Sequence, residues 1–287
     1  MTSDLDGKIC MITGSTSGIG KETAIDLARR GAIIILVGRN QRKTTDTASY
    51  IKSETGNENI YSYLCDLSSQ SSIHKLVKEI KVQFHELHVL VNNAGAIFLS
   101  RQKSADNIEM TFALNHLSYF LLSNLLLEIM ESSESARIIN VSSIAHKSAK
   151  FTLSDLETHH NYMFGFKAYC RSKLANLLFT YELAHRLRKT QITVNGLHPG
   201  VVSTNLLINN GFVGKIGNFF LGLHGITPKK GAETSIYLAT SKEVTGLTGR
   251  YYVDCKESPS SPASYDQEAA TKLWDISKDL TGLTNTI

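Results

Sequence analysis

A tyrosine and a lysine stand four residues apart in the segment Tyr169-Cys170-Arg171-Ser172-Lys173. At that spacing the two side chains lie one turn apart on the same face of a helix. A free tyrosine titrates near pH ~10, so its hydroxyl holds its proton too tightly to act as a base at neutral pH. A neighbouring lysine ammonium favours the phenolate, and such a pair can pass a proton to or from a carbonyl or alcohol oxygen. The motif alone is weak evidence, because a half-buried tyrosine beside a solvated lysine has the same spacing.

Short apolar runs alternate with helical segments along the chain, and they predict the frame that would position such a pair. The seven expected strands cover residues 9–13, 33–37, 60–65, 89–91, 137–143, 192–197 and 249–253. This alternation, without a repeat or a Pro/Ser-rich linker, predicts one domain over residues 1–287. The expected fold class is α/β, a doubly wound, Rossmann-type seven-stranded parallel sheet with helices on both faces. The carboxyl ends of all the strands then share one edge, where ligands bind in such sheets.

The turn after the first strand is rich in glycine and leads into a helix expected from about Lys21 to Arg30. It consists of Gly14, Ser15, Thr16, Ser17, Gly18, Ile19 and Gly20. A helix that begins there offers free backbone N–H groups and a positive dipole end to a pyrophosphate, and glycines let the backbone approach it. The spacing Gly-x-x-x-Gly-x-Gly departs from the usual dinucleotide fingerprint Gly-x-Gly-x-x-Gly. A plain tight turn is the alternative to nucleotide binding.

The residues after the second strand favour one nicotinamide cofactor over the other. Arg39 and Asn40 follow that strand within a basic run, and the next acid along the chain is Asp46. A carboxylate at the strand end would bind the ribose hydroxyls of NAD. A guanidinium there would hold the 2′-phosphate of NADP through charge-assisted hydrogen bonds. We therefore expect NADP(H), with a merely solvated basic turn as the alternative.

Small or polar residues follow the other strands and belong to the same expected edge. They are Asp66 and Leu67, Asn93, Ala94 and Gly95, Ser142 and Ser143, and Pro199, Gly200, Val202 and Thr204. Asp66 could cap the next helix, contact an adenine amino group, or do both. Asn115 lies on a predicted helix, where a lone asparagine is usually a surface residue or bends the helix.

Composition excludes several classes of protein. The chain is 42% hydrophobic and 20% charged with a formal net charge of +4, and no basic block marks a nucleic-acid partner. The four cysteines lie far apart, which indicates reduced thiols and neither disulfides nor zinc. His159 and His160 stand without other ligands at characteristic spacing, so we expect them to face solvent and expect no metal. No uninterrupted apolar run reaches the ~18 residues of a membrane span, so a cytoplasmic protein without a transmembrane segment is expected.

Residues 205–226 combine large apolar side chains with five glycines. This composition is typical of a mobile apolar lid over a substrate. An ordinary core helix and a peripheral membrane contact remain alternatives for the same segment.

In their order along the chain, these motifs resemble the short-chain dehydrogenase/reductase family over essentially the whole length. The matching stretches are Thr13-Gly14-x-x-x-Gly18-Ile19-Gly20, Asp66-Leu67, Asn92-Asn93-Ala94-Gly95, Asn115, Ser143, Tyr169-x-x-x-Lys173 and Pro199-Gly200. Each motif is weak alone, whereas the ordered set is highly specific.

The resemblance implies a role for each matching residue. Tyr169 would be the proton donor or acceptor, and Lys173 would bind the nicotinamide ribose hydroxyls and favour the phenolate. Ser143 would hold the substrate oxygen, and Asn115 would hold a water in a proton relay. The nicotinamide half of the cofactor would contact Asn93 and the loop 199–204. A homodimer through the helices of Asn115 and Tyr169 is implied as well, unless the outer faces of these helices are solvated or covered by the tail.

Within the family the chain looks most like the retinol dehydrogenase-like branch, which includes WW oxidoreductase. Residues 17–24, 169–176 and 269–274 carry this similarity. The branch implies hydride transfer on the pro-S face between NADPH and an apolar aldehyde, ketone or alcohol. Because the residues before the first strand are polar, we expect this chain to depart from the many animal members that carry an apolar N-terminal anchor. A nucleotide-binding scaffold without turnover and an NAD-dependent dehydrogenase of a polar alcohol are the competing functions.

Overall fold

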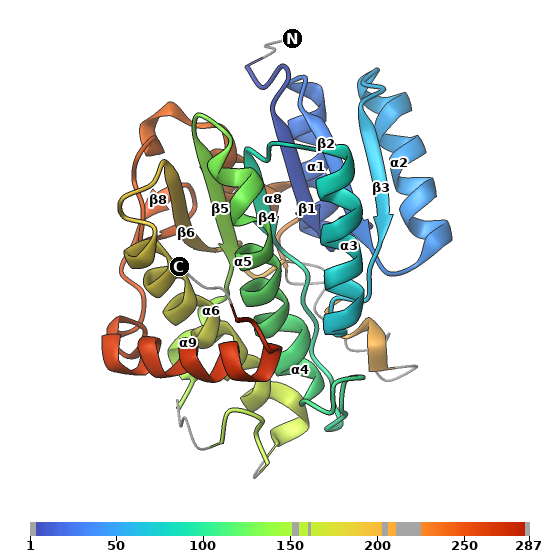
Figure 1. Cartoon of the computed structure of the whole chain (residues 1–287). Coiled ribbons are helices and arrows are strands. Elements are labelled where there is room, and N and C mark those ends of the chain that lie inside the picture. The colour runs from blue at the N-terminus through green and yellow to red at the C-terminus, as the bar shows by residue number, and fades with distance from the viewer. Residues whose placement is uncertain (1–3, 151–154, 160–161, 203–205, 211–224, 285–287) are drawn as a thin grey trace.

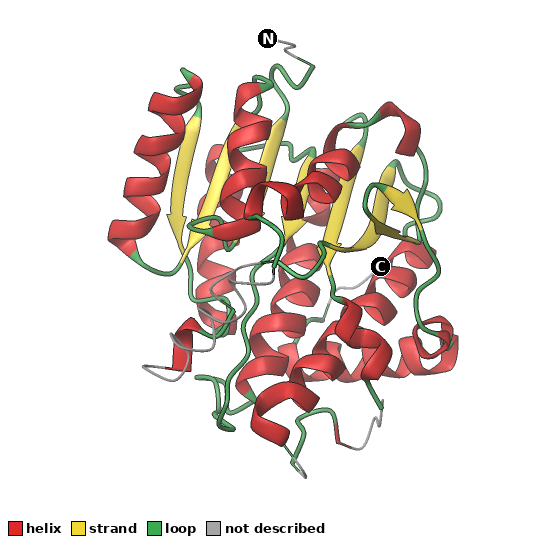
Figure 2. Ribbon diagram, turned by 180° about the vertical axis from the view of Figure 1, so that it is seen from behind, coloured by secondary structure: helices red, strands yellow, loops and turns green. Residues whose placement is uncertain are grey.

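One twisted sheet runs through the middle of the protein, and helices cover both of its faces (Figures 1 and 2). The structure is a computed structural model of the 287-residue chain, and it describes residues 4–150, 155–159, 162–202, 206–210 and 225–284. The strands are β1 (Ile9–Thr13), β2 (Ile33–Gly38), β3 (Ile60–Leu64), β4 (Val89–Asn92), β5 (Ala136–Val141), β6 (Ile192–His198), β7 (Arg250–Val253) and β8 (Lys256–Glu257). Their order across the sheet is β3-β2-β1-β4-β5-β6-β7-β8. The strand order reverses between β1 and β4, and ligands bind beside such a reversal.

The prediction of a Rossmann-type parallel sheet is confirmed, but the count of seven strands is too low. β1 to β7 are parallel, and the two-residue β8 pairs antiparallel with β7. Asp254 and Cys255 join the two strands with φ angles of 49° and 60°. Left-handed φ at both positions is the backbone of a type I′ turn. The sequence lacks the Asn-Gly pair that usually signals this turn, and two residues are too few for an apolar alternation.

Side chains at alternate positions of each strand face opposite helix layers. Met11 of β1 faces the layer of α3, α5 and α6, whereas its neighbours Cys10 and Ile12 face the layer of α1, α2 and α8. The helices are α1 (Gly18–Arg29), α2 (Gln41–Thr55), α3 (Gln70–Gln83), α4 (Met110–Phe112), the π-helix η1 (Ala113–Leu117), α5 (Ser118–Glu131), α6 (Phe166–Arg186), α8 (Pro228–Thr240) and α9 (Gln267–Thr281). Apolar cores on both faces hold the central strands in fixed register.

α4, η1 and α5 follow one another without a break as the helix Met110–Glu131. Among the described residues it is the one helix that length and composition would allow to cross a membrane. However, 78% of its apolar window is buried inside the protein. Such burial is the property of a core helix.

The C-terminal helix α9 lies across the outer side of α5 and α6 (Figure 1). Its Trp274 is 2% exposed, and its ring centroid lies 4.9 Å from that of Phe120 and 6.0 Å from that of Phe179. The Arg186 guanidinium lies 4.2 Å from the centroid of the Trp274 ring, in cation–π geometry. The chain's own tail therefore covers part of the outer side of these two helices, and the homodimer stays a prediction.

Candidate active site

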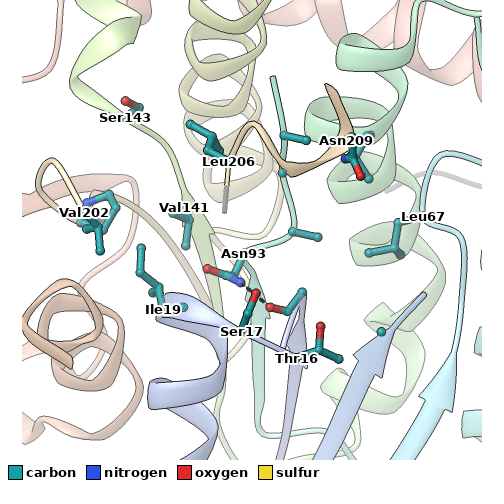
Figure 3. A pocket seen from close by; sticks show the side chains of 18 of the residues that line it. Thr16, Ser17, Ile19, Leu67, Asn93, Val141, Ser143, Val202, Leu206 and Asn209 are labelled. Carbon is teal, nitrogen blue, oxygen red and sulfur yellow. Dashed lines mark hydrogen bonds between the residues drawn. The ribbon is translucent and has the colours of Figure 1, made fainter. Parts of the chain in front are cut away.

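A cavity of about 820 Å³ opens where β1 to β6 end (Figure 3). The predicted site residues that line it are Gly14, Thr16, Ser17, Gly18, Ile19, Arg39, Asn40, Asp66, Leu67, Asn93, Ala94, Gly95, Ser143, Tyr169, Lys173, Pro199, Gly200 and Val202. Three others, Ser15, Gly20 and Asn115, are buried behind its wall, and Thr204 lies outside the described residues. Residues from six separate strand ends thus surround one space, while their binding roles remain predictions.

The glycine turn is packed too closely for larger residues. A Cβ atom on Gly20 would lie 2.5 Å from both the Gly14 carbonyl oxygen and Asn93 Nδ2, and Gly14 has φ +64°. The Asn93 amide nitrogen Nδ2 donates to the Thr13 carbonyl at 2.8 Å and joins the turn to the end of β4. Ser15 faces away from the cavity and donates to a carbonyl of β2 at 3.2 Å. Ser15 therefore holds the turn against the sheet and is not placed to bind a ligand.

The N-terminus of α1 faces the cavity, and its capping differs from that of α2 and α3. Ser17 is the N-cap of α1 and makes no side-chain capping hydrogen bond. In contrast, Asn40 and Ser69 cap α2 and α3 by accepting from backbone N–H groups. The backbone donors of the first turn of α1 therefore remain for an anionic group. This arrangement fits the pyrophosphate of a dinucleotide.

Asp66 lines the cavity, but it does not cap the next helix. Its Oδ1 accepts from the Ser68 backbone N–H at 3.0 Å and from the Ser68 hydroxyl at 2.7 Å. Ser69 provides the N-cap of α3. The capping role considered from the sequence is thus wrong, because the chain makes a tight polar turn before the helix starts. The position of Asp66 beside the cavity leaves the predicted adenine contact intact.

Arg39 stands at the rim beyond β2. Its Nη2 donates to Asn209 Oδ1 at 3.0 Å, and both residues line the cavity. Lys43 lines the cavity as well, and so does Asp46, whose negative charge partly offsets the two cations. The Arg42 side chain is 92% exposed and lies 3.7 Å from Asp46. Arg39 and Lys43 therefore reach the site, whereas Arg42 points into solvent.

Tyr169 and Ser143 meet inside the cavity. Burial raises the pKa of Tyr169 to about 12, although a hydrogen bond with the Ser143 side chain lowers it in part. The tyrosine is 8% exposed and sits on the first turn of α6. A hydroxyl with that pKa is protonated at neutral pH, so it is prepared to donate a proton.

Lys173 follows one turn later on α6 and is also buried. Its Nζ donates to the Val141 carbonyl at 3.0 Å, and burial lowers its pKa from 10.5 to about 7. The sequence predicts that a lysine ammonium favours the Tyr169 phenolate. In the protein without ligand, burial disfavours the charged form of both side chains and so opposes this effect, which stays a prediction for the enzyme with cofactor bound.

Asn115 is a fully buried residue of the π-helix η1, not a surface residue. Its Nδ2 donates to the Ala96 carbonyl at 3.0 Å and to Ser172 Oγ at 3.1 Å, and its Oδ1 accepts from the Ala96 N–H at 2.9 Å. A Cβ atom on Gly95 would lie 3.3 Å from Asn115 Oδ1 and 3.4 Å from Lys173 Nζ. Asn115 thus fixes the cavity wall beside the lysine, and π-helical turns often mark functional sites.

Several lining residues carry no signal in the sequence. Among them are the apolar residues Leu114, Ile144 and Phe166 and a histidine, His198. Of the expected lid 205–226, the structure describes 206–210 and 225–226, and Leu206 and Asn209 line the cavity. The remainder of that segment lies outside the described residues. These side chains reach the cavity because of how the fold packs their helices, strands and turns together, which no spacing rule encodes.

The expectation about metals is tested only in the described part of the chain. There, no group of three or more His, Cys, Asp or Glu side chains could hold a metal ion. His159 is exposed, as expected for the histidine pair, and His160 lies outside the described residues. The four cysteines are free thiols.

A parallel sheet with a glycine turn, an uncapped helix and a long cavity at the strand ends defines a dinucleotide-binding protein of the Rossmann type. The family model described as short chain dehydrogenase matches residues 8–211, and the chain belongs to that family of oxidoreductases. The chain is 40% identical to human retinol dehydrogenase 12 over 279 residues, which are 97% of this chain and 88% of that protein. Within the family, this chain belongs to the retinol dehydrogenase-like branch.

Solved structures share the fold. A crystal structure of an uncharacterised protein from Mycobacterium paratuberculosis has a TM-score of 0.80 at 29% identity and covers 100% of this chain and 99% of that one. A short chain dehydrogenase from Escherichia coli CFT073, complexed with NADPH, has a TM-score of 0.70 at 22% identity and covers 89% of this chain and 100% of that one. The second likeness speaks for the fold alone.

Proposed function

We propose that this oxidoreductase is NADP(H)-dependent and acts on an apolar carbonyl or alcohol, with Tyr169 as the acid/base. The observation that carries the proposal is the shared cavity, which Tyr169, Ser143 and Lys173 line together with residues of the glycine turn. When bound, the cofactor would supply a hydride to the substrate carbon or take one from it. The residues of the chain provide binding, orientation and the proton.

Each of the three side chains has a task that follows from its surroundings. Tyr169, with a pKa of about 12, donates its proton to the substrate oxygen during reduction. Ser143, which already hydrogen-bonds the tyrosine, holds the same oxygen. Lys173, anchored at 3.0 Å on the Val141 carbonyl, is placed to bind ribose hydroxyls. Its nearby charge, once a ligand stabilises it, favours the Tyr169 phenolate, which is the form that accepts the proton in the oxidation direction.

The preference for NADP(H) rests on Arg39 and Lys43 at the end of β2, where a carboxylate would favour NAD. The preference for an apolar substrate rests on the wall formed by Leu114, Ile144 and Phe166. The name of human retinol dehydrogenase 12, to which the chain is 40% identical, agrees with an apolar alcohol as substrate. The complex of the Escherichia coli protein with NADPH agrees with the cofactor.

The first experiment is NADPH oxidation measured with a panel of apolar aldehydes and ketones. We expect turnover by the wild type and its nearly complete loss in Tyr169→Phe, with NADPH binding retained. Tyr181→Phe is the matched control, since it removes the hydroxyl of a half-buried tyrosine on the same helix, which bonds Ser260 at 2.7 Å away from the cavity. If no carbonyl of the panel leads to NADPH oxidation, the non-catalytic nucleotide-binding scaffold is favoured. Faster turnover with polar alcohols and NAD would favour the NAD-dependent dehydrogenase of a polar alcohol.

The cofactor preference is tested by fluorescence titration of Arg39→Ala with NADPH and NADH. Loss of a charge-assisted contact worth about 1.5–3 kcal/mol should weaken NADPH binding by roughly 10- to 100-fold and leave NADH binding nearly unchanged. Arg42→Ala is the control, because it removes the same charge three residues further along the chain. The Arg42 side chain is 92% exposed and points into solvent. Equal losses in both variants, or equal wild-type affinity for the two cofactors, would refute the role of Arg39.

A further inference from the structure

Two histidines hold the peptide group that joins Ser143 to Ile144. The Ser143 carbonyl oxygen lies 2.6 Å from His146 Nδ1, and the Ile144 N–H donates to His198 Nδ1 at 3.2 Å. These two groups belong to the same peptide bond, so an imidazole contacts it at each end. Neither histidine belongs to the tyrosine–lysine pair or to the glycine turn.

The partners determine which nitrogen of each ring carries the proton. A backbone N–H can only donate, and the Ser261 N–H points at His146 Nε2 from 3.0 Å. His146 Nε2 is therefore the acceptor, and the proton sits on Nδ1, where it donates to the Ser143 carbonyl. By the same reasoning His198 Nδ1 accepts from Ile144, which leaves the proton of His198 on Nε2.

The surroundings keep both rings neutral and immobile. His146 is fully buried, and burial lowers its pKa from the usual value. Burial also lowers the pKa of His198 to about 4, and the neighbouring His146 and Lys147 act in the same direction against Asp254. The Tyr251 ring packs edge-on against His146 with the centroids 5.2 Å apart. At neutral pH both hydrogen bonds to the peptide are therefore present.

The peptide group fixes the direction of the Ser143 side chain. On the other side of the residue, the Ser142 N–H donates to the Leu197 carbonyl at 2.8 Å, as part of the β5–β6 pairing. The strand is thus paired up to the residue before Ser143, and the clamped peptide after Ser143 sets the direction of its Cα–Cβ bond. Ser143 Oγ then accepts from the Ala145 N–H at 3.2 Å and hydrogen-bonds Tyr169.

We propose that His146 and His198 are positioning residues, which clamp the Ser143–Ile144 peptide and thereby aim Ser143 Oγ at Tyr169 and at the substrate oxygen. This inference rests on the proposed function. Errors of about 1 Å in such an arrangement cost about 100-fold in rate. The clamp thus links turnover to two side chains that need not touch the substrate.

Asparagine and glutamine variants separate the two nitrogens of each ring. Asparagine places its amide near the position of Nδ1, and glutamine places it near Nε2. His146→Asn keeps the hydrogen bond to the Ser143 carbonyl and loses the one from the Ser261 N–H, whereas His146→Gln keeps the second and loses the first. His198→Asn keeps an acceptor for the Ile144 N–H, and His198→Gln removes that acceptor. We expect kcat to fall by roughly 10- to 100-fold in the two glutamine variants and by less than about 3-fold in the two asparagine variants, with NADPH affinity unchanged.

His88→Gln is the matched control for a purely structural effect. His88 Nδ1 accepts from the Ile9 N–H at 3.1 Å, which is the same kind of bond at the opposite edge of the sheet. Its loss should lower stability and leave kcat unchanged. Equal kcat in the asparagine and glutamine variants, or a loss of kcat in His88→Gln as large as theirs, would overturn the proposal.

A second measurement needs no substrate. Long-range proton–nitrogen NMR spectra of the wild type at pH 7 should show His146 with its proton on Nδ1 and His198 with its proton on Nε2. The opposite tautomer, or a charged ring, at either position overturns the clamp even where the enzyme is active. A wild type without turnover on any carbonyl refutes the proposed function instead, and the tautomers then decide alone whether the clamp exists.

Discussion

Replacing Lys173 with methionine should change how the stability of the cofactor-free protein depends on pH. The folded lysine is 3% exposed, and its pKa falls from 10.5 to about 7 through burial. The unfolded lysine binds its proton up to the ordinary pKa near 10.5. Between these values the unfolded state binds more protons than the folded state, so the free energy of unfolding rises with pH. Methionine has a similar length and nothing to titrate, so the variant lacks this contribution.

The shift sets the size of the effect. Its full value corresponds to about 5 kcal/mol of destabilisation below pH 7, at roughly 1.4 kcal/mol for each pKa unit. Between pH 6 and pH 8.5 about 2 kcal/mol of this is relieved in the wild type. The variant also loses the hydrogen bond from Nζ to the Val141 carbonyl, which costs about 1 kcal/mol and does not depend on pH. We therefore expect Lys173→Met to be more stable than the wild type at pH 6, with the advantage shrinking by about 2 kcal/mol at pH 8.5.

Urea unfolding followed by the fluorescence of Trp274, the one tryptophan of the chain, measures both proteins between pH 6 and pH 8.5. Histidines and thiols titrate alike in the two proteins, so their contributions cancel in the difference. Lys75→Met, at a side chain that is 80% exposed, should follow the wild-type curve. Parallel curves for the wild type and Lys173→Met would refute the buried neutral lysine and the argument built on it.

Two further substitutions test the frame around the site. Trp274→Ala should lower the free energy of unfolding by about 3–5 kcal/mol, because it removes the ring through which α9 packs on Phe120 and Phe179. Urea unfolding followed by circular dichroism measures this free energy. A decrease below about 1 kcal/mol would contradict tight docking of the tail. Gly165→Ala should reduce turnover sharply, since its Cβ would lie 2.1 Å from the Phe98 carbonyl just before α6. Gly246→Ala has a similar φ of +72° with open space around it, so it isolates the cost of backbone strain, about 1 kcal/mol; equal activity of the two variants would exclude the clash.

The collection of site residues at one sheet edge was predictable because the geometry of parallel strands demands it. Asn93 and Ser143 are far apart along the chain, yet each directly follows a strand, and both line the cavity. The glycine turn was predictable for a similar reason, because a strand, a tight turn and a helix are consecutive in sequence. Predictions of this kind need only local patterns and the shared direction of the strands.

The chemical state of the site could not be predicted from those patterns. The pattern around Asn115 left a surface residue and a helix-bending residue open, because its partner Ser172 lies 57 positions away and no periodicity reports that contact. The ammonium of Lys173 was expected to lower the pKa of Tyr169, but burial decides the charge of both, and burial is a property of the whole fold. His146 escaped notice because its amide partner Ser261 lies 115 positions away.

The same long-range contacts explain why a tyrosine and a lysine four residues apart are weak evidence by themselves. α6 carries both residues, and it is fixed from several sides by segments distant in sequence. Arg171, between them, donates to Asp155 at 2.9 Å and Thr158 at 3.2 Å, and so ties the helix to the connection before it. On another side, Asn115 Nδ2 of η1 donates to Ser172 Oγ of α6 at 3.1 Å. A helix without such supports would present the same spacing on a surface, where both side chains would keep ordinary pKa values and no cavity would bring them a ligand.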